Sequence, residues 1–193
     1  MGLDMYLERM PRFEDVTPQQ VSSITSYFRW KDAKAEKSKY ANCTFKKWCG
    51  IDYADLPKKA IKFYQPFYTT KYALWDENRH CGWKQIEEEV AYWRKANAIH
   101  KWFVENVQAG VDNCGYYEVS QYQLQELLDV CKQVYENPSS ASELLPTTRG
   151  FFFGSTDYDE WYIEDIRHTG EMLSKILQET DFDKQMIAYR ASW

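Results

Sequence analysis

The chain has 193 residues, of which 44% are hydrophobic, so it is long enough to bury a core within one domain. Its formal net charge of -5 excludes the general electrostatic attraction on which non-specific binding to nucleic acids or anionic membranes depends. There is no run of 18 apolar residues, and charges and prolines replace the apolar core of a signal peptide in the first 20 residues. We therefore expect a cytoplasmic protein without a membrane partner, and with no nucleic acid as a direct partner.

Five cysteines are present, and their number and spacing argue against a disulfide framework or a zinc site. They are Cys43, Cys49, Cys81, Cys114 and Cys131, an odd number in which no two form a C-x-x-C pair. Reduced thiols are expected, and the sequence predicts no metal and no cofactor. Aromatic residues make up 17% of the chain, which favours a binding role because these rings combine large contact area with polar groups.

The first 40 residues predict a strand followed by a helix. Residues 2–8 alternate between apolar and polar side chains, which is the period of a half-buried strand. Thr17 followed by Pro18 is typical of a helix start, and the apolar stripe that follows predicts a helix ending near Tyr40. Residues 41–83 are irregular and rich in turn formers, with one short helix expected over 57–64, and we assign them to the same domain.

A longer periodic pattern begins at Lys84. Residues of this pattern recur at alternating intervals of four and three, which predicts one central helix of more than five turns. The stripe consists of Ile86, Val90, Trp93, Asn97, His100, Val104 and Val107.

The remainder of the chain predicts two strands and two helices before a final strand over 185–192. A short strand is expected at 116–119, and Ser120 with Gln123 predicts a capping box for the helix that follows. The apolar run at 150–154 is interpreted as a buried strand that leads into a helix ending near Glu179. Trp161 is expected to face the core from that helix. The fold class is therefore α+β: a small antiparallel sheet packed by about four to five α-helices in a single compact domain, 1–193.

The central stripe contains two polar residues, Asn97 and His100, which point toward the core or into a pocket opening from it. One interpretation is a core hydrogen-bond pair, because a buried amide and imidazole need partners. The other is a ligand site in which Trp93 stacks on the ligand while Arg94 or Lys95 reaches an anion from the rim.

The small-residue loop at Ser155 and Thr156 is a second candidate for ligand binding. Free backbone N–H groups between a strand and a helix can hold an anion. The loop lacks the spacing of a Walker motif and of a dinucleotide fingerprint. The acidic residues that follow it complement the helix N-terminus, so ordinary capping is the alternative interpretation.

An acidic and aromatic segment follows the loop and is the candidate protein-binding surface. Its residues are Asp157, Tyr158, Asp159, Glu160, Trp161 and Asp165. Such a surface suits a basic protein partner. The carboxylates of this segment, with Glu164 one turn after Glu160, are alternatively a site for a divalent metal in a hydrolase or nuclease.

Several stretches together resemble a widespread family of small proteins encoded by bacteriophages and prophages. They are MGLDMYL at the start, YWRKANAIHKWF at 92–103, GFFFGSTDYDEWY at 150–162 and the closing Ser192-Trp193. The family has no assigned function, so the resemblance implies a protein made in a bacterial host cell but no reaction. Many relatives carry a longer insertion where this chain has only residues 137–145, so an activity housed in that insertion is in doubt here.

These observations lead to one main functional hypothesis. We expect a phage accessory protein that acts by binding, as an inhibitor of a host defence system in the manner of an anti-CRISPR protein. The partner is either a defence nuclease, met by the acidic aromatic surface in imitation of nucleic-acid charge, or a small nucleotide signal, sequestered beside Trp93, Asn97 and His100. The alternative is a small nucleotide-processing enzyme, with or without a metal, in which His100 acts as general acid or base.

Overall fold

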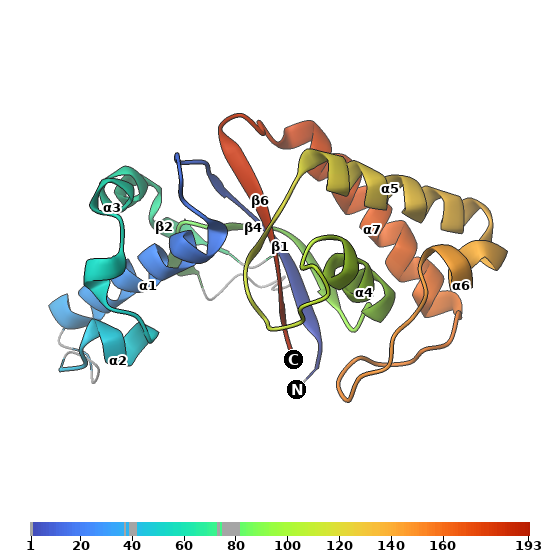
Figure 1. The fold of residues 1–193 in the computed structure, drawn as a ribbon, viewed down its shortest axis with the longest axis horizontal. Coiled ribbons are helices and arrows are strands. Elements are labelled where there is room, and N and C mark those ends of the chain that lie inside the picture. The colour runs from blue at the N-terminus through green and yellow to red at the C-terminus, as the bar shows by residue number, and fades with distance from the viewer. Residues whose placement is uncertain (1, 37, 39–41, 73, 75–81) are drawn as a thin grey trace.

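The structure is a computed structural model that describes residues 2–36, 38, 42–72, 74 and 82–193. The fold is α+β, as the sequence predicts, with a four-stranded antiparallel sheet in the order β4-β1-β6-β5 and a two-stranded sheet of β2 and β3 (Figure 1). The strands are β1 (Asp4–Pro11), β2 (Thr69–Lys71), β3 (Trp83–Gln85), β4 (Glu88–Arg94), β5 (Tyr117–Val119) and β6 (Gln185–Ser192).

The described residues form seven α-helices and three short 3-10 turns. The helices are α1 (Pro18–Ala35), α2 (Phe45–Cys49), α3 (Lys58–Tyr64), α4 (Asn97–Asn106), α5 (Gln121–Glu136), α6 (Ala141–Leu144) and α7 (Glu160–Glu179). The 3-10 turns are η1 (Tyr53–Asp55), η2 (Gln65–Phe67) and η3 (Pro138–Ser140). The predicted capping box at Ser120 is confirmed, and so is the helix start at Pro18, which has a capping box of its own. That the chain is a single domain stays a prediction.

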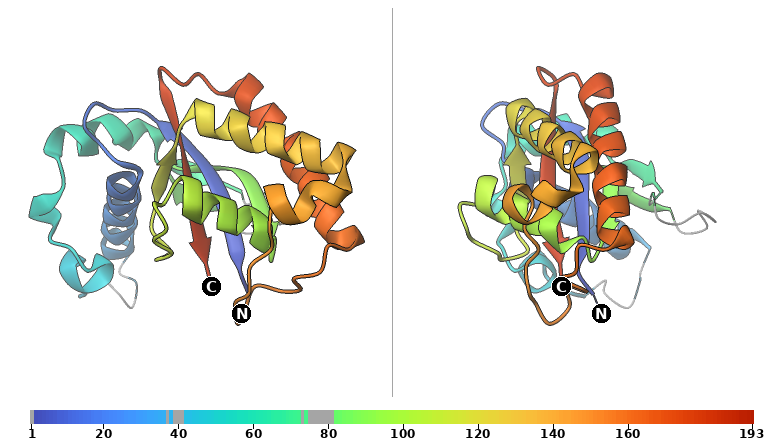
Figure 2. Two further views of the ribbon diagram at one scale, coloured as in Figure 1. Left: turned by 45° about the vertical axis from the view of Figure 1, so that its right-hand side comes forward. Right: turned by 90° about the vertical axis from the view of Figure 1, so that its right-hand side faces the viewer.

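Strand β1 separates two hydrophobic clusters because its side chains alternate between the faces of the sheet. Leu3, Met5 and Leu7 are fully buried in the cluster with α4, α5 and α7. Met10 points to the other face and belongs to the cluster with α1, α2 and α3. Figures 1 and 2 show these two groups of helices on opposite sides of the sheet, with α5 and α7 side by side.

The predicted central helix is wrong in its first half. Residues Glu88–Arg94 form β4, which pairs antiparallel with β1, and only Asn97–Asn106 is helical. Ile86 and Trp93 lie on the same predicted helical stripe, yet they are buried in different hydrophobic clusters. The apolar spacing of four and three is thus accidental here, because pairing with a strand 79 to 90 residues earlier determines the backbone of β4.

The predicted strand at 150–154 is also wrong. This segment is a turn in which Phe151 is 95% exposed, and Gly154 has φ of 87°, a conformation that a strand excludes. Helix α7 begins only at Glu160, with Asp159 as its N-cap. Trp161 does not face the core but is 79% exposed, because the buried stripe of α7 passes through the adjacent Tyr162.

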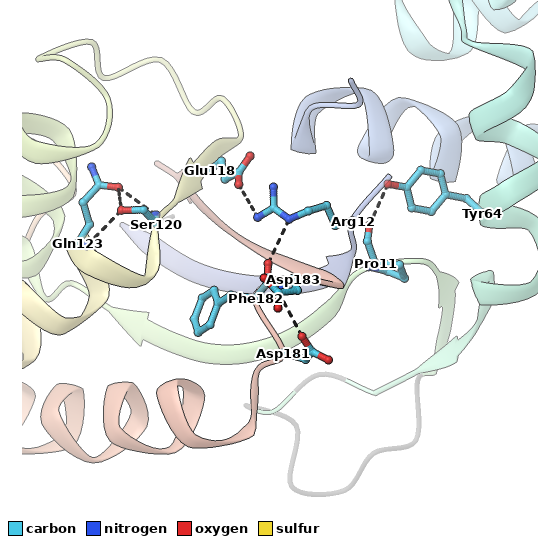
Figure 3. Close-up of polar contacts among 9 residues, drawn as sticks. All are labelled: Pro11, Arg12, Tyr64, Glu118, Ser120, Gln123, Asp181, Phe182 and Asp183. Carbon is cyan, nitrogen blue, oxygen red and sulfur yellow. Dashed lines mark hydrogen bonds and ion pairs between the residues drawn. The ribbon is translucent and has the colours of Figure 1, made fainter. Parts of the chain in front are cut away.

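The end of the sheet remote from both termini is tied together by Arg12 (Figure 3). Its guanidinium donates to the Glu118 carboxylate at 2.8 Å and to the carbonyl of Phe182 at 3.3 Å. The hydroxyl of Tyr64 donates to the carbonyl of Pro11 at 2.9 Å, which attaches α3 to the same end of β1. These contacts fix this end of β1 relative to β5, to α3 and to the segment that leads into β6.

Two sequence expectations concern features that the fold only partly addresses. In the described residues, no helix has the length and apolarity needed to cross a membrane. Cys43, Cys49, Cys114 and Cys131 are free thiols, and Cys81 lies outside the described residues.

Candidate functional site

A cleft of about 320 Å³ opens where the end of β4, the loop 147–157 and the start of α7 meet. It brings together residues of both predicted sites. From the predicted ligand site come Arg94, Lys95, Asn97 and Ser155, and from the predicted protein-binding surface come Asp157, Asp159, Trp161 and Asp165. The predicted residues Trp93, His100, Thr156, Tyr158 and Glu160 do not line it.

Asn97 positions the loop that forms one wall of the cleft. Its side-chain amide donates to the carbonyls of Phe153 at 3.1 Å and Ser155 at 2.7 Å, while its Oδ1 accepts from the Thr148 amide at 3.0 Å. The backbone amide of Leu3 adds a bond to the Phe152 carbonyl. Asn97 is therefore mainly a buried structural residue, as the core interpretation expects. It also contributes to the lining of the cleft, as the pocket interpretation expects.

The basic side of the cleft is formed by Arg94 and Lys95 at the end of β4. Both side chains are exposed, and neither forms an ion pair with a described residue. Lys95 has φ of 63°, in the left-handed region that residues other than glycine rarely adopt. Its amide is held by the Leu3 carbonyl at 2.8 Å, so the turn that places these two cations is fixed by β1. Strained backbone of this kind is concentrated at functional sites.

The acidic side of the cleft comes from the loop and from α7, and its carboxylates differ in their partners. Asp157 accepts from the hydroxyl of Ser155, and Asp159 accepts from the Tyr162 amide as the N-cap of α7. The Asp165 carboxylate has no hydrogen bond or ion pair with a described residue. Burial, followed by the negative charges of Asp159 and Glu164, raises the pKa of Asp165 to about 6.

Of the two aromatic residues of the predicted protein-binding surface, Trp161 lies at the mouth of the cleft, and Tyr158 contacts two residues of its lining, Thr147 and Tyr162. The Trp161 ring lines the cleft and is 79% exposed. Tyr158 is partly exposed, packs edge-on against Tyr162 and accepts a hydrogen bond from the Thr147 amide. Glu160 is exposed in the first turn of α7. An exposed tryptophan surrounded by carboxylates is the kind of group that anchors protein interfaces.

His100, on α4, and Trp93, on β4, are buried in the core and make polar contacts there. The His100 ring is 1% exposed, with Nδ1 2.7 Å from the Tyr189 hydroxyl and Nε2 3.0 Å from the Asp112 carboxylate. The Trp93 indole donates to the Thr169 hydroxyl at 2.8 Å. Both ring nitrogens of His100 have hydrogen-bond partners within the protein, as expected for a buried core histidine.

Sequence reasoning missed two features of the site and its surroundings. Thr147 lines the cleft and its hydroxyl donates to the Thr156 carbonyl, yet it stands in a polar connector that carries no pattern. On the opposite face of the sheet, Glu8 is 5% exposed and accepts from Arg190 at 2.9 Å, and its Oε2 has no partner. The alternation of β1 assigns Glu8 to the face opposite Leu7 but gives no sign that Glu8 is buried.

We compared the chain with models of protein families, with curated proteins and with solved structures, and none of them matches. The resemblance to phage proteins therefore stays a prediction. Within the described residues, no group of three or more histidine, cysteine, aspartate or glutamate side chains is arranged to hold a metal ion.

Proposed function

We propose that this chain is a phage-encoded accessory protein that inhibits a bacterial defence system by binding one of its proteins. The binding surface is the acidic aromatic surface: Asp157, Tyr158, Asp159, Glu160, Trp161 and Asp165. The observation that carries the proposal is Trp161, which is 79% exposed among these carboxylates at the mouth of a cleft. A solvent-exposed tryptophan of this kind contributes most when a partner covers it.

The charges of the cleft favour a protein partner over a sequestered nucleotide. Three carboxylates, Asp157, Asp159 and Asp165, line it against two cations, Arg94 and Lys95, so the lining has a net negative charge that opposes the several phosphate charges of a nucleotide. Nucleic-acid-binding enzymes present basic surfaces to their substrates, and an acidic surface competes for them. The defence setting comes from the sequence resemblance to phage proteins and from nothing in the fold.

The alternative function, a nucleotide-processing enzyme, depended on His100 as general acid or base. A general acid or base must lie within hydrogen-bond reach of the substrate. His100 is 1% exposed and contacts Tyr189 and Asp112, so this geometry supports the binding function better.

The proposal is tested by expressing the protein in bacteria that each carry one defence system and counting plaques of a phage that the system restricts. We expect wild-type protein to restore plaques against one system, and Trp161→Ala to abolish the effect at equal protein level. Tyr122→Ala is the matched control, because Tyr122 is 75% exposed on α5 and outside the cleft. Equal activity of Trp161→Ala, or no effect against any nucleic-acid-targeting system, contradicts the proposal.

A further inference from the structure

The cleft contains charges of both signs that do not neutralise one another. Arg94 and Lys95 lie at the end of β4, and Asp165 lies in the second turn of α7. None of the three belongs to an ion pair between described residues. Asp165 is partly buried, and a partly buried charge is most stable with a partner nearby. Arg94 and Lys95 are exposed cations on the other side of the cleft and are free to pair with an anionic group of a ligand.

A ligand with a single charge can pair with only one side of the cleft. A phosphate or carboxylate alone would be attracted by Arg94 and Lys95 but repelled by Asp165, and a simple cation would meet the reverse. A ligand that carries both charges satisfies both sides. The volume of about 320 Å³ is at the small end of ligand sites, about 300–1,000 Å³, which suits a group the size of one amino acid.

The aromatic ring at the mouth of the cleft indicates which cation fits. The Trp161 side chain lines the cleft on the same helix as Asp165, four residues earlier, and residues at this spacing lie on one face. A guanidinium or ammonium group that reaches Asp165 can therefore also lie against the indole ring, and tryptophan is the best aromatic partner for such a cation.

We infer that the cleft binds a basic amino acid that carries a free carboxylate. The guanidinium or ammonium group pairs with Asp165 beside Trp161, and the carboxylate pairs with Arg94 and Lys95. Free arginine or lysine and the carboxyl-terminal residue of a protein share this chemistry. The inference goes beyond the proposed function, because it concerns the interior of the cleft and is tested on the purified protein without any host partner.

The test is isothermal titration of the full chain at about pH 7.5, where Asp165 is ionised. The probes are L-arginine, a short neutral peptide that ends in arginine with a free carboxylate, and the same peptide with a carboxyl-terminal amide. We expect the free-carboxylate peptide, L-arginine or both to bind, and the amide to bind about tenfold more weakly or not at all. Comparable binding of L-arginine identifies the free amino acid as the source, whereas tenfold tighter binding of the peptide identifies a protein terminus.

Two variants test whether Asp165 binds the cationic group of the ligand and Arg94 its carboxylate. Asp165→Asn and Arg94→Gln are each expected to weaken binding about tenfold. Both are expected to fold, because neither side chain bonds to a described residue, and thermal unfolding checks this. Glu126→Gln is the control, since Glu126 is an exposed acid on α5. Absence of binding by every probe, equal binding of the amide, or unchanged binding by both cleft variants overturns the inference. Plaque protection that depends on Trp161 would then still stand, so the two proposals fail separately.

Discussion

Nε2 of His100 lies 3.0 Å from Oδ2 of Asp112, which joins helix α4 to the segment that leads into β5. On the other side of the ring, the Tyr189 hydroxyl lies 2.7 Å from Nδ1, and burial raises the pKa of Tyr189, which keeps this hydroxyl protonated. The second oxygen of Asp112 accepts from the indole of Trp193, the last residue of the chain. His100 is thus the centre of a buried network that connects α4, β6 and the carboxyl terminus.

His100→Gln is expected to lower the free energy of unfolding by about 2–3 kcal/mol, because it leaves buried polar groups without partners. Binding in the cleft should be unchanged at temperatures where the variant is folded. Urea denaturation measures the first effect and titration the second. His168→Gln is the control, because His168 is exposed on α7 and its replacement should change stability by less than about 0.5 kcal/mol. A fully stable His100→Gln protein that has lost binding would mean that His100 acts on a ligand.

Asn97→Asp is expected to release the loop that forms one wall of the cleft. The new carboxylate keeps the acceptor for Thr148 but places an oxygen against the carbonyls of Phe153 and Ser155, at an expected loss of about 2 kcal/mol. Hydrogen exchange should increase at amides of residues 147–156. Asn106→Asp is the comparison, since among the described residues the Asn106 side chain donates only to the Trp102 carbonyl, one turn earlier in α4. Unchanged exchange in the loop of the Asn97 variant would show that other contacts hold it.

Lys95→Gly is expected to stabilise the protein while weakening binding in the cleft. Glycine adopts φ near 63° without the steric cost that lysine bears, so the gain should be about 1 kcal/mol. Lys95→Ala removes the same charge but keeps the strain. Both variants should bind the arginine-ending peptide more weakly, and only the glycine variant should unfold at a higher temperature than wild type. Equal unfolding temperatures of the two variants would exclude strain at this position.

Glu8 makes stability depend on pH in a predictable direction. Burial raises the pKa of Glu8 from 4.5 to about 7, against the opposing effect of Arg190. The folded state therefore holds the Glu8 proton to higher pH than the unfolded state does. The stability that this proton contributes is fully present below about pH 4.5 and is lost as the pH rises through about 7. The total fall attributable to Glu8 is at most about 3 kcal/mol.

Glu8→Gln removes this titration. Between about pH 6 and 7 the slope of unfolding free energy against pH should become flatter in the variant. Asp165, whose pKa is about 6, adds a similar slope in this window, and because it is present in both proteins the difference between wild type and Glu8→Gln reports Glu8 alone. Denaturant titrations at several pH values measure the slope. Glu126→Gln should leave it unchanged. The same slope in wild type and Glu8→Gln would place the titrating group elsewhere.

The sequence predicts those parts of the fold that local patterns determine. The alternation of β1, the helix start at Thr17 and Pro18 and the capping box at Ser120 are all confirmed. Each depends on neighbouring residues alone, so a single sequence contains the information. The strand β4 was missed because its conformation depends on pairing with β1, far away in the sequence.

For the cleft too, the sequence predicts individual residues but not the contacts between distant segments that bring them together. Sequence patterns selected Arg94, Lys95 and Asp165 as separate candidates, but nothing in the sequence places them in one cavity. That arrangement depends on the Asn97 hydrogen bonds that fold the loop 147–157 back on α4. A helical period that continues through residues 88–94 places His100 on the same face as Trp93 and Asn97. Because the backbone changes from strand to helix at Lys95, His100 instead points into the core.

The most direct test of the binding surface is site-specific photo-crosslinking in living bacteria that carry the defence system identified by the plaque assay. A photo-reactive amino acid replaces either Trp161, at the mouth of the cleft, or Tyr122, on the exposed side of α5. We predict that position 161 crosslinks to a protein of that system, identified by mass spectrometry, and that position 122 does not. Crosslinks from position 122 alone, or none from position 161 while the protein still protects the phage, would contradict the assignment of this surface.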